Sequence, residues 1–328
     1  MRKKDIWLKK LNRQITNSKK LDKVLNFKKN FQSKKILKNS NFPLKIPISF
    51  LKGIKNKNFQ DPIFRQFIPN IKEKRNYKNI IKDPILGKKN SVPGLLHKYK
   101  NRILLILNKE CAIHCRYCFR KNFTYKNNTI NLKNFHLIIE YIQKNRNINE
   151  VIFSGGDPLI EKDEKIRIFI KLLENIPQIK ILRVHSRFPT IIPERITEEL
   201  CKIFSSSRLI ICFVTHINHP KEINKKVIKY IKKLKESNVR LFNQSVLLKG
   251  INDEVSILKN LSYKLFEIGI VPYYIHMLDL VEGTKHFLVE EKIAKKIIKK
   301  LSQEISGYLL PRLVRELPGY LSKVFLNF

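Results

Sequence analysis

Residues 102–120 read Arg102-Ile-Leu-Leu-Ile-Leu-Asn108, then Lys-Glu, then Cys111-Ala-Ile-His-Cys-Arg-Tyr-Cys-Phe-Arg120. The first segment is an unbroken apolar run that ends in polar residues, which is typical of a strand buried on both faces of a parallel sheet. The cysteines therefore follow the carboxyl end of a predicted strand. Because α/β folds place their chemistry on the loops at that end, the stretch predicts an α/β protein with a cysteine site there.

Three cysteines stand in this loop with the spacing C-x3-C-x2-C, at Cys111, Cys115 and Cys118. Thiolates are the usual ligands of iron–sulfur clusters, and a four-iron cluster held by only three of them keeps one iron open. Disulfides are disfavoured, because three neighbouring cysteines cannot all pair and no secretory signal precedes them. A zinc site would need a fourth ligand. No second C-x2-C pair exists, and His114 would be crowded by its cysteine neighbours, so the pattern favours an iron–sulfur cluster.

Strand and helix patterns alternate from residue 102 onward. The expected strands cover residues 102–108, 151–154, 181–185, 209–215, 239–247 and 271–278. Amphipathic segments lie between them, for example Leu132–Tyr141 and Val227–Leu234. Such alternation predicts a parallel sheet covered by helices, with too few units for the eight of a closed barrel.

The chain is expected to have three parts, and its 328 residues suffice for one large α/β domain with extensions. Residues 1–100 form a Lys/Asn-rich N-terminal helical extension, residues 101–306 the alternating core, and residues 307–328 a tail that caps part of it. In the extension, apolar residues recur irregularly and prolines break longer helices. The apolar residues are Val24, Phe27, Phe31 and Leu37, and the prolines are Pro43, Pro47, Pro62 and Pro69.

Composition points to a cytoplasmic globular protein. Hydrophobic residues make up 43% of the chain, and no apolar run approaches the ~20 residues of a membrane span. The charged N-terminus lacks the apolar segment of a signal peptide. Five cysteines, three of them clustered, suit a reducing cytosol, and Cys201 and Cys212 read as small core residues.

The formal net charge of +40 has two possible explanations. A basic chain often binds nucleic acid or an acidic partner. Here the excess is nearly all Lys, spread along the whole chain and accompanied by Asn and Ile, which are residues of A/T-rich codons. Codon drift is the favoured explanation, and an acidic partner remains the alternative.

The predicted strand, the cysteine spacing and the aromatic Tyr117 directly before the last cysteine resemble the radical S-adenosylmethionine (SAM) enzymes. The resemblance implies a [4Fe-4S] cluster whose open iron binds the amino and carboxylate groups of SAM. An electron then splits SAM to give a 5′-deoxyadenosyl radical. The resemblance also implies an open (β/α)6 barrel, a partial TIM barrel.

Further segments resemble the lysine 2,3-aminomutase branch of that family, which adds pyridoxal 5′-phosphate (PLP) to SAM. They are Asn243–Asp253, Pro272–Asp279, His286-Phe287 and Gly307–Arg312, with Phe59–Pro69, Asp83–Ile85 and Val92–Gly94 in the N-terminal extension. The resemblance covers roughly residues 55–328. It implies an isomerase that converts L-lysine to β-lysine on a PLP aldimine, and PLP requires a lysine that forms a Schiff base.

The family places this PLP lysine seven residues after an acidic residue that follows a Gly-Tyr-x-x-Pro motif. Here Gly307-Tyr308 leads to Glu316, and Lys323 lies seven residues further. Tyr320 and Leu321 depart from the glycines usual before this lysine. Without the motif, Lys323 would read as an exposed tail lysine; with it, Lys323 is the expected PLP anchor.

The resemblance also assigns candidate ligand contacts. Ser154, Gly155, Gly156 and Asp157 match the glycine motif that binds SAM, although paired glycines alone fit a plain tight turn equally well. Further SAM contacts are Tyr117, His216 and Gln244; a histidine at a strand end is, by itself, more often a structural hydrogen-bonding group.

Arg120 matches the arginine that forks the substrate carboxylate, and Asp279 and Glu316 match acidic groups that hold the substrate ε-ammonium. Candidates for the PLP phosphate are Lys98, Tyr99, Arg102, Ser186 and Arg187. Lys98 replaces a usual arginine and would act as a point charge.

The chain ends soon after Lys323, without the tail cysteines that bind structural zinc in clostridial-type aminomutases, and Glu254 replaces another zinc cysteine. This short form resembles the bacterial aminomutase that makes β-lysine for modification of elongation factor P (EF-P). The resemblance implies a reductant protein such as flavodoxin or ferredoxin, and neither a membrane nor a specific nucleic acid as partner. Two alternatives stay open: a 2,3-aminomutase for another amino acid, and a binding module for nucleic acid or an acidic protein.

Overall fold

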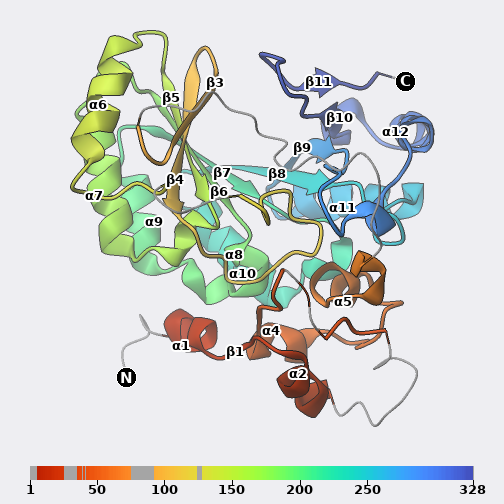
Figure 1. Cartoon of the computed structure of the whole chain (residues 1–328). Coiled ribbons are helices and arrows are strands. Elements are labelled where there is room, and N and C mark those ends of the chain that lie inside the picture. Colours follow the sequence, from red (N-terminus) through yellow and green to blue (C-terminus); the bar gives the residue numbers. More distant parts are fainter. Residues whose placement is uncertain are drawn as a thin grey trace.

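The computed structural model of the chain describes residues 6–25, 35–38, 40, 42–74, 92–123 and 128–327. Within these residues, one sheet of nine strands has the order β11-β10-β9-β8-β7-β6-β5-β4-β3 (Figure 1). Neighbouring strands from β4 to β10 are parallel, and β3 and β11 are antiparallel to the strands beside them. The strands are β3 (Leu95–Tyr99), β4 (Arg102–Asn108), β5 (Glu150–Gly155), β6 (Ile181–Ser186), β7 (Ile210–Thr215), β8 (Arg240–Val246), β9 (Val271–His276), β10 (Arg312–Arg315) and β11 (Val324–Phe325).

The strands expected from the sequence are present as β4 to β9, with ends that differ by only one or two residues. The α/β fold with a largely parallel sheet is therefore confirmed. The sheet also contains strands that the sequence did not predict. β3 lies in the predicted N-terminal extension, and β10 and β11 lie in the predicted tail, so both extensions add strands to the edges of the core sheet.

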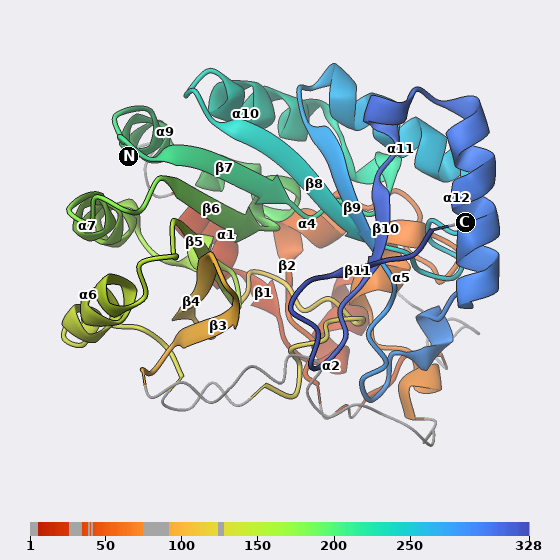
Figure 2. The ribbon, with the colours of Figure 1, turned by 90° about the horizontal axis from the view of Figure 1, so that it is seen from above.

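Long helices cover the outer face of the sheet (Figure 2). The predicted amphipathic segments form α6 and α10, which bury Phe135, Ile138 and Ile142 in one and Val227, Ile231 and Leu234 in the other. α10 begins after Asn224, whose side chain accepts hydrogen bonds from the first backbone N–H groups of the helix. The helices are α6 (Phe135–Lys144), α7 (Asp163–Glu174), α8 (Phe188–Ile191), α9 (Glu198–Ser205), α10 (Lys225–Lys235), α11 (Val255–Glu267) and α12 (Glu291–Glu304), with 3-10 turns η3 (Pro158–Ile160), η4 (Pro193–Arg195), η5 (Pro220–Glu222), η6 (Lys285–Phe287) and η7 (Gly307–Leu309).

The N-terminal extension forms short helices below the sheet in Figure 1. Pro47 directly precedes one helix and Pro62 begins another, where its missing N–H and fixed φ are tolerated. The elements are α1 (Ile6–Asn12), β1 (Gln14–Ile15), α2 (Ser18–Leu25), β2 (Ile46–Pro47), α4 (Ile48–Gly53), α5 (Pro62–Phe67) and η2 (Ile71–Lys74). Of the segments singled out in the sequence, Phe27, Phe31 and Asp83–Ile85 lie outside the described residues.

The N-terminal extension is joined to the cysteine loop by backbone hydrogen bonds and an ion pair. The backbone N–H of His114 donates to the Lys45 carbonyl at 2.9 Å, and that of Arg116 donates to the Gln66 carbonyl at 2.8 Å. Arg116 is fully buried and pairs with Glu73 at 2.5 Å. Removing one partner of a buried charge pair leaves the other charge uncompensated and strongly destabilises a protein. The pair therefore fixes this part of the extension to the cysteine loop.

The core lies between the sheet and its outer helices. Phe169 of α7 packs on Phe135 of α6 and Phe153 of β5, with ring centroids 5.2 Å and 6.3 Å apart. Each fully buried side chain of this kind stabilises the fold by about 1.5–3 kcal/mol. In the part of the chain that the structure describes, no helix combines the length and the apolar character needed to cross a membrane.

Candidate active site

A cavity of about 320 Å³ opens where the parallel strands end. Every site residue predicted from the sequence lines it, although those residues are spread from position 98 to position 323. They are Lys98, Tyr99, Arg102, Cys111, Cys115, Tyr117, Cys118, Arg120, Ser154, Gly155, Gly156, Asp157, Ser186, Arg187, His216, Gln244, Asp279, Glu316 and Lys323. The roles assigned to them remain predictions. Those at or after the carboxyl ends of β4 to β9 converge because parallel topology brings the carboxyl ends of successive strands together. Lys98 and Tyr99 come instead from the antiparallel strand β3, Arg102 from the start of β4, and Glu316 and Lys323 from the tail.

The three cysteines lie on one loop, and all of them line this cavity. The backbone N–H of Cys118 donates to the Cys115 carbonyl at 3.0 Å, which closes a tight turn. Burial raises the pKa of all three thiols, that of Cys118 to about 11. Thiolates at these positions therefore need a cationic partner, which iron supplies.

The cysteines fit a cluster better than a single ion. Among the residues that the structure describes, no three His, Cys, Asp or Glu side chains gather closely enough to hold one metal ion. The thiolates of an iron–sulfur cluster bind different iron atoms, so they surround a larger body instead of converging on one point. The arrangement of Cys111, Cys115 and Cys118 around a shared cavity fits that requirement.

The paired glycines let the β5 loop approach the cysteine loop. Gly155 has φ of +125°, and a Cβ on Gly156 would lie 2.1 Å from the carbonyl oxygen of Glu110. The N–H of Gly156 donates to the Asn108 carbonyl, and the N–H of Asp157 donates to the Glu110 carbonyl, both at 2.7 Å. Glycine is therefore required here by a backbone-to-backbone contact, whether or not a ligand also uses the loop.

Asp157 connects the glycine loop to the end of β6. Its carboxylate accepts hydrogen bonds from the Ser186 hydroxyl and the Arg187 N–H, each at 2.8 Å. Burial raises the pKa of Asp157 to about 6, against the opposing effect of these hydrogen bonds. These contacts join Ser186 to the glycine loop, whereas the sequence predicted it to serve the PLP phosphate.

Tyr117 and His216, which both line the cavity, stack on each other. Their rings are 5.8 Å apart with an interplanar angle of 20°, and the Tyr117 hydroxyl lies 3.0 Å from His216 Nε2. Burial, reinforced by the charge of Arg187, lowers the pKa of His216 well below its usual range. The imidazole is thus neutral, and its Nε2 can accept the hydroxyl hydrogen.

Lys323, in the tail, also lines the cavity and is held by Glu316. Its Nζ donates to Glu316 Oε2 at 2.7 Å and to the Tyr99 hydroxyl at 3.2 Å. Lys98 Nζ also pairs with Glu316 and donates to the Leu317 carbonyl at 3.0 Å. Burial alone would raise the pKa of Glu316, but the two ammonium groups outweigh it and lower the pKa to about 2.

Asp279 and Arg120 also belong to the polar lining. Burial, followed by the negative charge of Glu316, raises the pKa of Asp279 to about 7. Arg120 Nη1 donates to the Ser154 hydroxyl at 2.9 Å and to the Gly155 carbonyl at 2.8 Å. These contacts fix the guanidinium beside the glycine loop, with its other N–H groups near the cavity.

The cavity also contains polar residues that the sequence reading missed. Arg183 and His185 alternate along β6, and Tyr274 and His276 alternate along β9. Burial and the charge of Lys323 lower the pKa of His276 to about 3, so its imidazole is neutral. Polar residues two positions apart within an otherwise apolar strand were the signal that could have revealed them, because such residues share one face.

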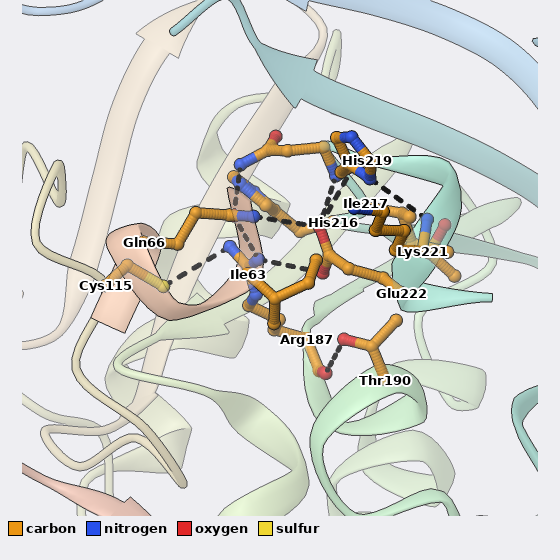
Figure 3. Close-up of polar contacts among 12 residues, drawn as sticks. Ile63, Gln66, Cys115, Arg187, Thr190, His216, Ile217, His219, Lys221 and Glu222 are labelled. Carbon is orange, nitrogen blue, oxygen red and sulfur yellow. Dashed lines mark hydrogen bonds and ion pairs between the residues drawn. The ribbon is translucent and has the colours of Figure 1, made fainter. Parts of the chain in front are cut away.

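Arg187 does not lie with the other predicted phosphate residues. Its guanidinium contacts Cys115, Gln66 and Glu222 (Figure 3). It also donates to the Tyr117 hydroxyl, so it lies beside the cysteine loop. Lys98 and Tyr99 instead meet Glu316 and Lys323. The residues predicted to bind the PLP phosphate therefore lie in two separate places. Arg187 directly follows β6, whereas Lys98 and Tyr99 belong to the antiparallel edge strand β3.

The chain shares sequence features with known proteins along almost its entire length. Residues 105–259 match the family model for the radical SAM superfamily. The chain is 48% identical to an L-lysine 2,3-aminomutase from Buchnera aphidicola subsp. Baizongia pistaciae, over 99% of this chain and 96% of that protein. L-lysine 2,3-aminomutases from Haemophilus influenzae and Escherichia coli are 45% and 41% identical, over 97% and 98% of this chain and 95% and 94% of theirs.

Among solved structures, a radical SAM methyltransferase from Sphaerobacter thermophilus aligns over 67% of this chain and 68% of its own, with a TM-score of 0.49 and 13% identity. The sequence relationships are much closer than this structural one. The matched family model spans the cysteine loop and β5 to β8, and the relatives span nearly the whole chain. The chain therefore belongs to the radical SAM superfamily and, within it, to the L-lysine 2,3-aminomutase family.

Proposed function

We propose that this protein converts L-lysine to β-lysine by moving an amino group between adjacent carbons. The observation that carries the proposal is the single cavity in which three cysteines, a glycine loop and the Lys323–Glu316 pair face one another. Few reactions require both a cluster site for radical formation and a lysine that can bind PLP. Radical migration of an amino group is one reaction that does. Relatives bearing the name L-lysine 2,3-aminomutase, at 41–48% identity, support the same reading.

Each cofactor has a set of residues suited to hold it. Cys111, Cys115 and Cys118 would hold a [4Fe-4S] cluster, and Lys323 would anchor PLP. SAM would lie between them, along the residues Tyr117, Ser154, Gly155, Gly156, Asp157, His216 and Gln244. Together the cluster and SAM supply a radical that removes hydrogen from substrate, and PLP carries the nitrogen that migrates.

The side chains around Lys323 suit a substrate with a cationic end. Glu316 now pairs with the Lys323 ammonium, and Asp279 lies close enough for its pKa to respond to both. PLP, when bound, would be held by Lys323, and replacement of Lys323 by the substrate amino group would release the Lys323 amine. Asp279 and Glu316 would hold the substrate ε-ammonium, while Arg120 would bind the carboxylate at the other end.

Positioning is the main task of these residues. Migration between neighbouring carbons needs no general base, so the chain must chiefly hold the substrate carbon against the radical source and exclude water. An aminomutase for a neutral or acidic amino acid is disfavoured, because the side-chain end of its substrate would offer no cation to the carboxylates of Asp279 and Glu316.

The proposed pathway, reductant and cellular compartment are those that the resemblance to the short form of the family implies. We infer that the β-lysine supplies modification of EF-P, that the reductant is a protein such as flavodoxin or ferredoxin, and that the enzyme works in the cytoplasm. We also interpret the consecutive parallel order β4 to β9 as an open (β/α)6 barrel. In this interpretation the N-terminal extension closes the barrel behind the cysteines and the tail brings Lys323 over its mouth.

The direct test is product formation by the reconstituted protein. The chain is loaded anaerobically with iron and sulfide, then incubated with SAM, PLP, reductant and L-lysine, and the amino acids are separated by chromatography before mass spectrometry. β-Lysine should form from L-lysine, and no 3-amino isomer should form from L-glutamate or L-alanine in parallel reactions. SAM cleavage with no β-lysine would retain the radical chemistry and discard lysine as substrate.

A further inference from the structure

We propose that Arg187 is a positioning residue for the iron–sulfur cluster: it fixes the Cys115 thiolate through an N–H···S hydrogen bond and raises the cluster's reduction potential. The inference rests on the proposed function, because it requires that Cys115 binds a cluster. It departs from the sequence-based expectation that Arg187 binds the PLP phosphate.

The contact itself is direct. Arg187 Nη1 lies 3.4 Å from the sulfur of Cys115, within hydrogen-bonding distance for a sulfur acceptor (Figure 3). The same nitrogen also donates to the Tyr117 hydroxyl. Hydrogen bonds to cluster sulfurs are one of the main ways in which proteins set reduction potentials. They stabilise the more negative, reduced cluster.

Arg187 is locked in this orientation from its other side. Nη2 donates to Gln66 Oε1 at 2.8 Å and to Glu222 Oε2 at 2.9 Å. Its backbone N–H donates to Asp157, and its guanidinium lies over the Phe67 ring at 4.7 Å from the ring centroid. The rigid guanidinium fork can satisfy these partners at once, which a lysine ammonium on a flexible stem cannot.

The carboxylate that balances Arg187 is itself fixed. The Glu222 side chain is fully buried and accepts from the backbone N–H groups of Asn218 at 2.9 Å and His219 at 3.1 Å. The ion pair therefore cannot reorient without leaving buried groups unpaired. Its cationic Nη1 edge faces the cysteine and its Nη2 edge faces the carboxylate, so the nearest charge to the sulfur is positive.

This arrangement also gives the N-terminal extension a part in the cluster site. Gln66 belongs to α5, and its side-chain oxygen accepts from both Arg187 and Asn218. Its backbone carbonyl accepts from Arg116 in the cysteine loop. One residue of α5 thus touches both the loop that carries the cysteines and the arginine that contacts Cys115.

The test is the reduction potential of the cluster in the full-length, reconstituted protein, followed by electron paramagnetic resonance during a redox titration. Arg187→Gln should bind a cluster that is about tenfold harder to reduce, which for one electron is about 59 mV more negative. Arg187→Lys, which keeps the charge without the fork, should shift less. Arg183→Gln is the matched control, because Arg183 lines the same cavity but pairs with Glu150 at 2.5 Å, and its potential should equal that of the wild type.

A wild-type potential in Arg187→Gln, with full iron content, would overturn the proposal, and so would an equal shift in Arg183→Gln. Folded Arg187→Gln with reduced iron content would support it, because a cysteine left unfixed binds iron less well. If both Arg187 variants unfold, Glu222→Gln decides: it preserves shape and removes the charge that fixes Arg187, so an unchanged potential contradicts the proposal. A wild-type protein that binds no cluster would instead contradict the proposed function itself.

Discussion

The carboxylate of Glu316 is shared by three residues: the predicted PLP anchor Lys323 and two predicted ligands of the PLP phosphate, Lys98 and Tyr99. It accepts from Lys323 and Tyr99 and pairs with Lys98. The two ammonium groups keep it ionised at any physiological pH. A single acidic side chain thus holds the predicted PLP anchor in place and is also the predicted partner of the substrate ammonium, so its charge should matter in both states.

Glu316→Gln should weaken lysine binding. Replacing the carboxylate by an amide removes a charge-assisted hydrogen bond worth about 1.5–3 kcal/mol, so KM for lysine should rise by about tenfold or more. The measurement is steady-state kinetics of β-lysine formation. Glu291→Gln serves as control, because Glu291 pairs with Arg315 and Lys295 on the surface of α12 and should leave KM unchanged. An equal KM in Glu316→Gln would remove Glu316 from the substrate site.

Asp279→Asn should make the cofactor-free protein more stable while impairing catalysis. Folding raises the pKa of Asp279 from 3.8 to about 7, so the folded protein binds more protons than the unfolded chain between these values. The free energy of unfolding therefore falls as pH rises through this window. Asparagine avoids that loss, and thermal unfolding should show a higher Tm for the variant above pH 7 and a smaller difference near pH 4.

The same substitution should raise KM for lysine and lower turnover, because the ε-ammonium loses a carboxylate. A wild-type Tm across the whole pH range would contradict the burial of an ionisable Asp279. Unchanged kinetics would contradict its assignment to the substrate.

At the level of elements, the sequence predicted the buried strands and missed the edges. β4, β5 and β7 carry largely apolar runs, as expected of strands in the middle of a covered sheet. In β6, β8 and β9, polar residues that line the cavity interrupt the apolar pattern, but enough apolar residues remain to indicate a strand. β3 carries Lys98 and Tyr99, and β10 has only four residues with an arginine at each end, so neither shows such a run. Their pairing depends on long-range register, which a local pattern does not contain.

Residues of the candidate site could likewise be predicted only where a local sequence motif marks them. Motif spacing indicated the cysteines, the glycine loop and Lys323, because those residues are tied to fixed points of the chain. The contacts of Arg187 with Gln66 and Glu222 join an inner strand end to α5 and η5. Only the folded chain brings these segments together, so no local pattern distinguishes Arg187 from a phosphate ligand.

The glycine loop offers a test of how closely two elements must approach. Gly156→Ala places a Cβ 2.1 Å from the backbone oxygen of Glu110, which forces the β5 loop and the cysteine loop apart. Reconstituted protein should contain several-fold less iron and should unfold at a lower temperature. Gly53→Ala, where nothing lies within 4 Å of the added carbon, should match the wild type in both measurements. Full iron content in Gly156→Ala would show that the two loops need not touch.

At the scale of the whole molecule, the net charge of +40 has no counterpart in the site. The cavity is lined by both signs, and most of its cations have a carboxylate partner: Lys98 and Lys323 pair with Glu316, Arg187 with Glu222 and Arg183 with Glu150. Arg102 and Arg120 contact uncharged groups instead. The charge therefore acts at the surface, where salt screens it within about 10 Å at 0.1 M.

This surface charge should give only non-specific attraction to polyanions. Retention of the protein on immobilised DNA should fall steeply with salt and should be the same for unrelated sequences. Binding that persists at high salt or prefers one sequence would favour a nucleic-acid partner over codon drift.

In the proposed function, one cavity unites a radical source with a PLP lysine to move an amino group. The most direct measurement supplies L-lysine whose α-amino group carries a heavy nitrogen isotope to reconstituted wild-type protein and Lys323→Ala, and locates the label in the product by nuclear magnetic resonance. The wild type should place the labelled nitrogen on the adjacent carbon of β-lysine, and Lys323→Ala should form none. Label that stays on its original carbon in the wild type, or β-lysine formed equally well by Lys323→Ala, would contradict the account.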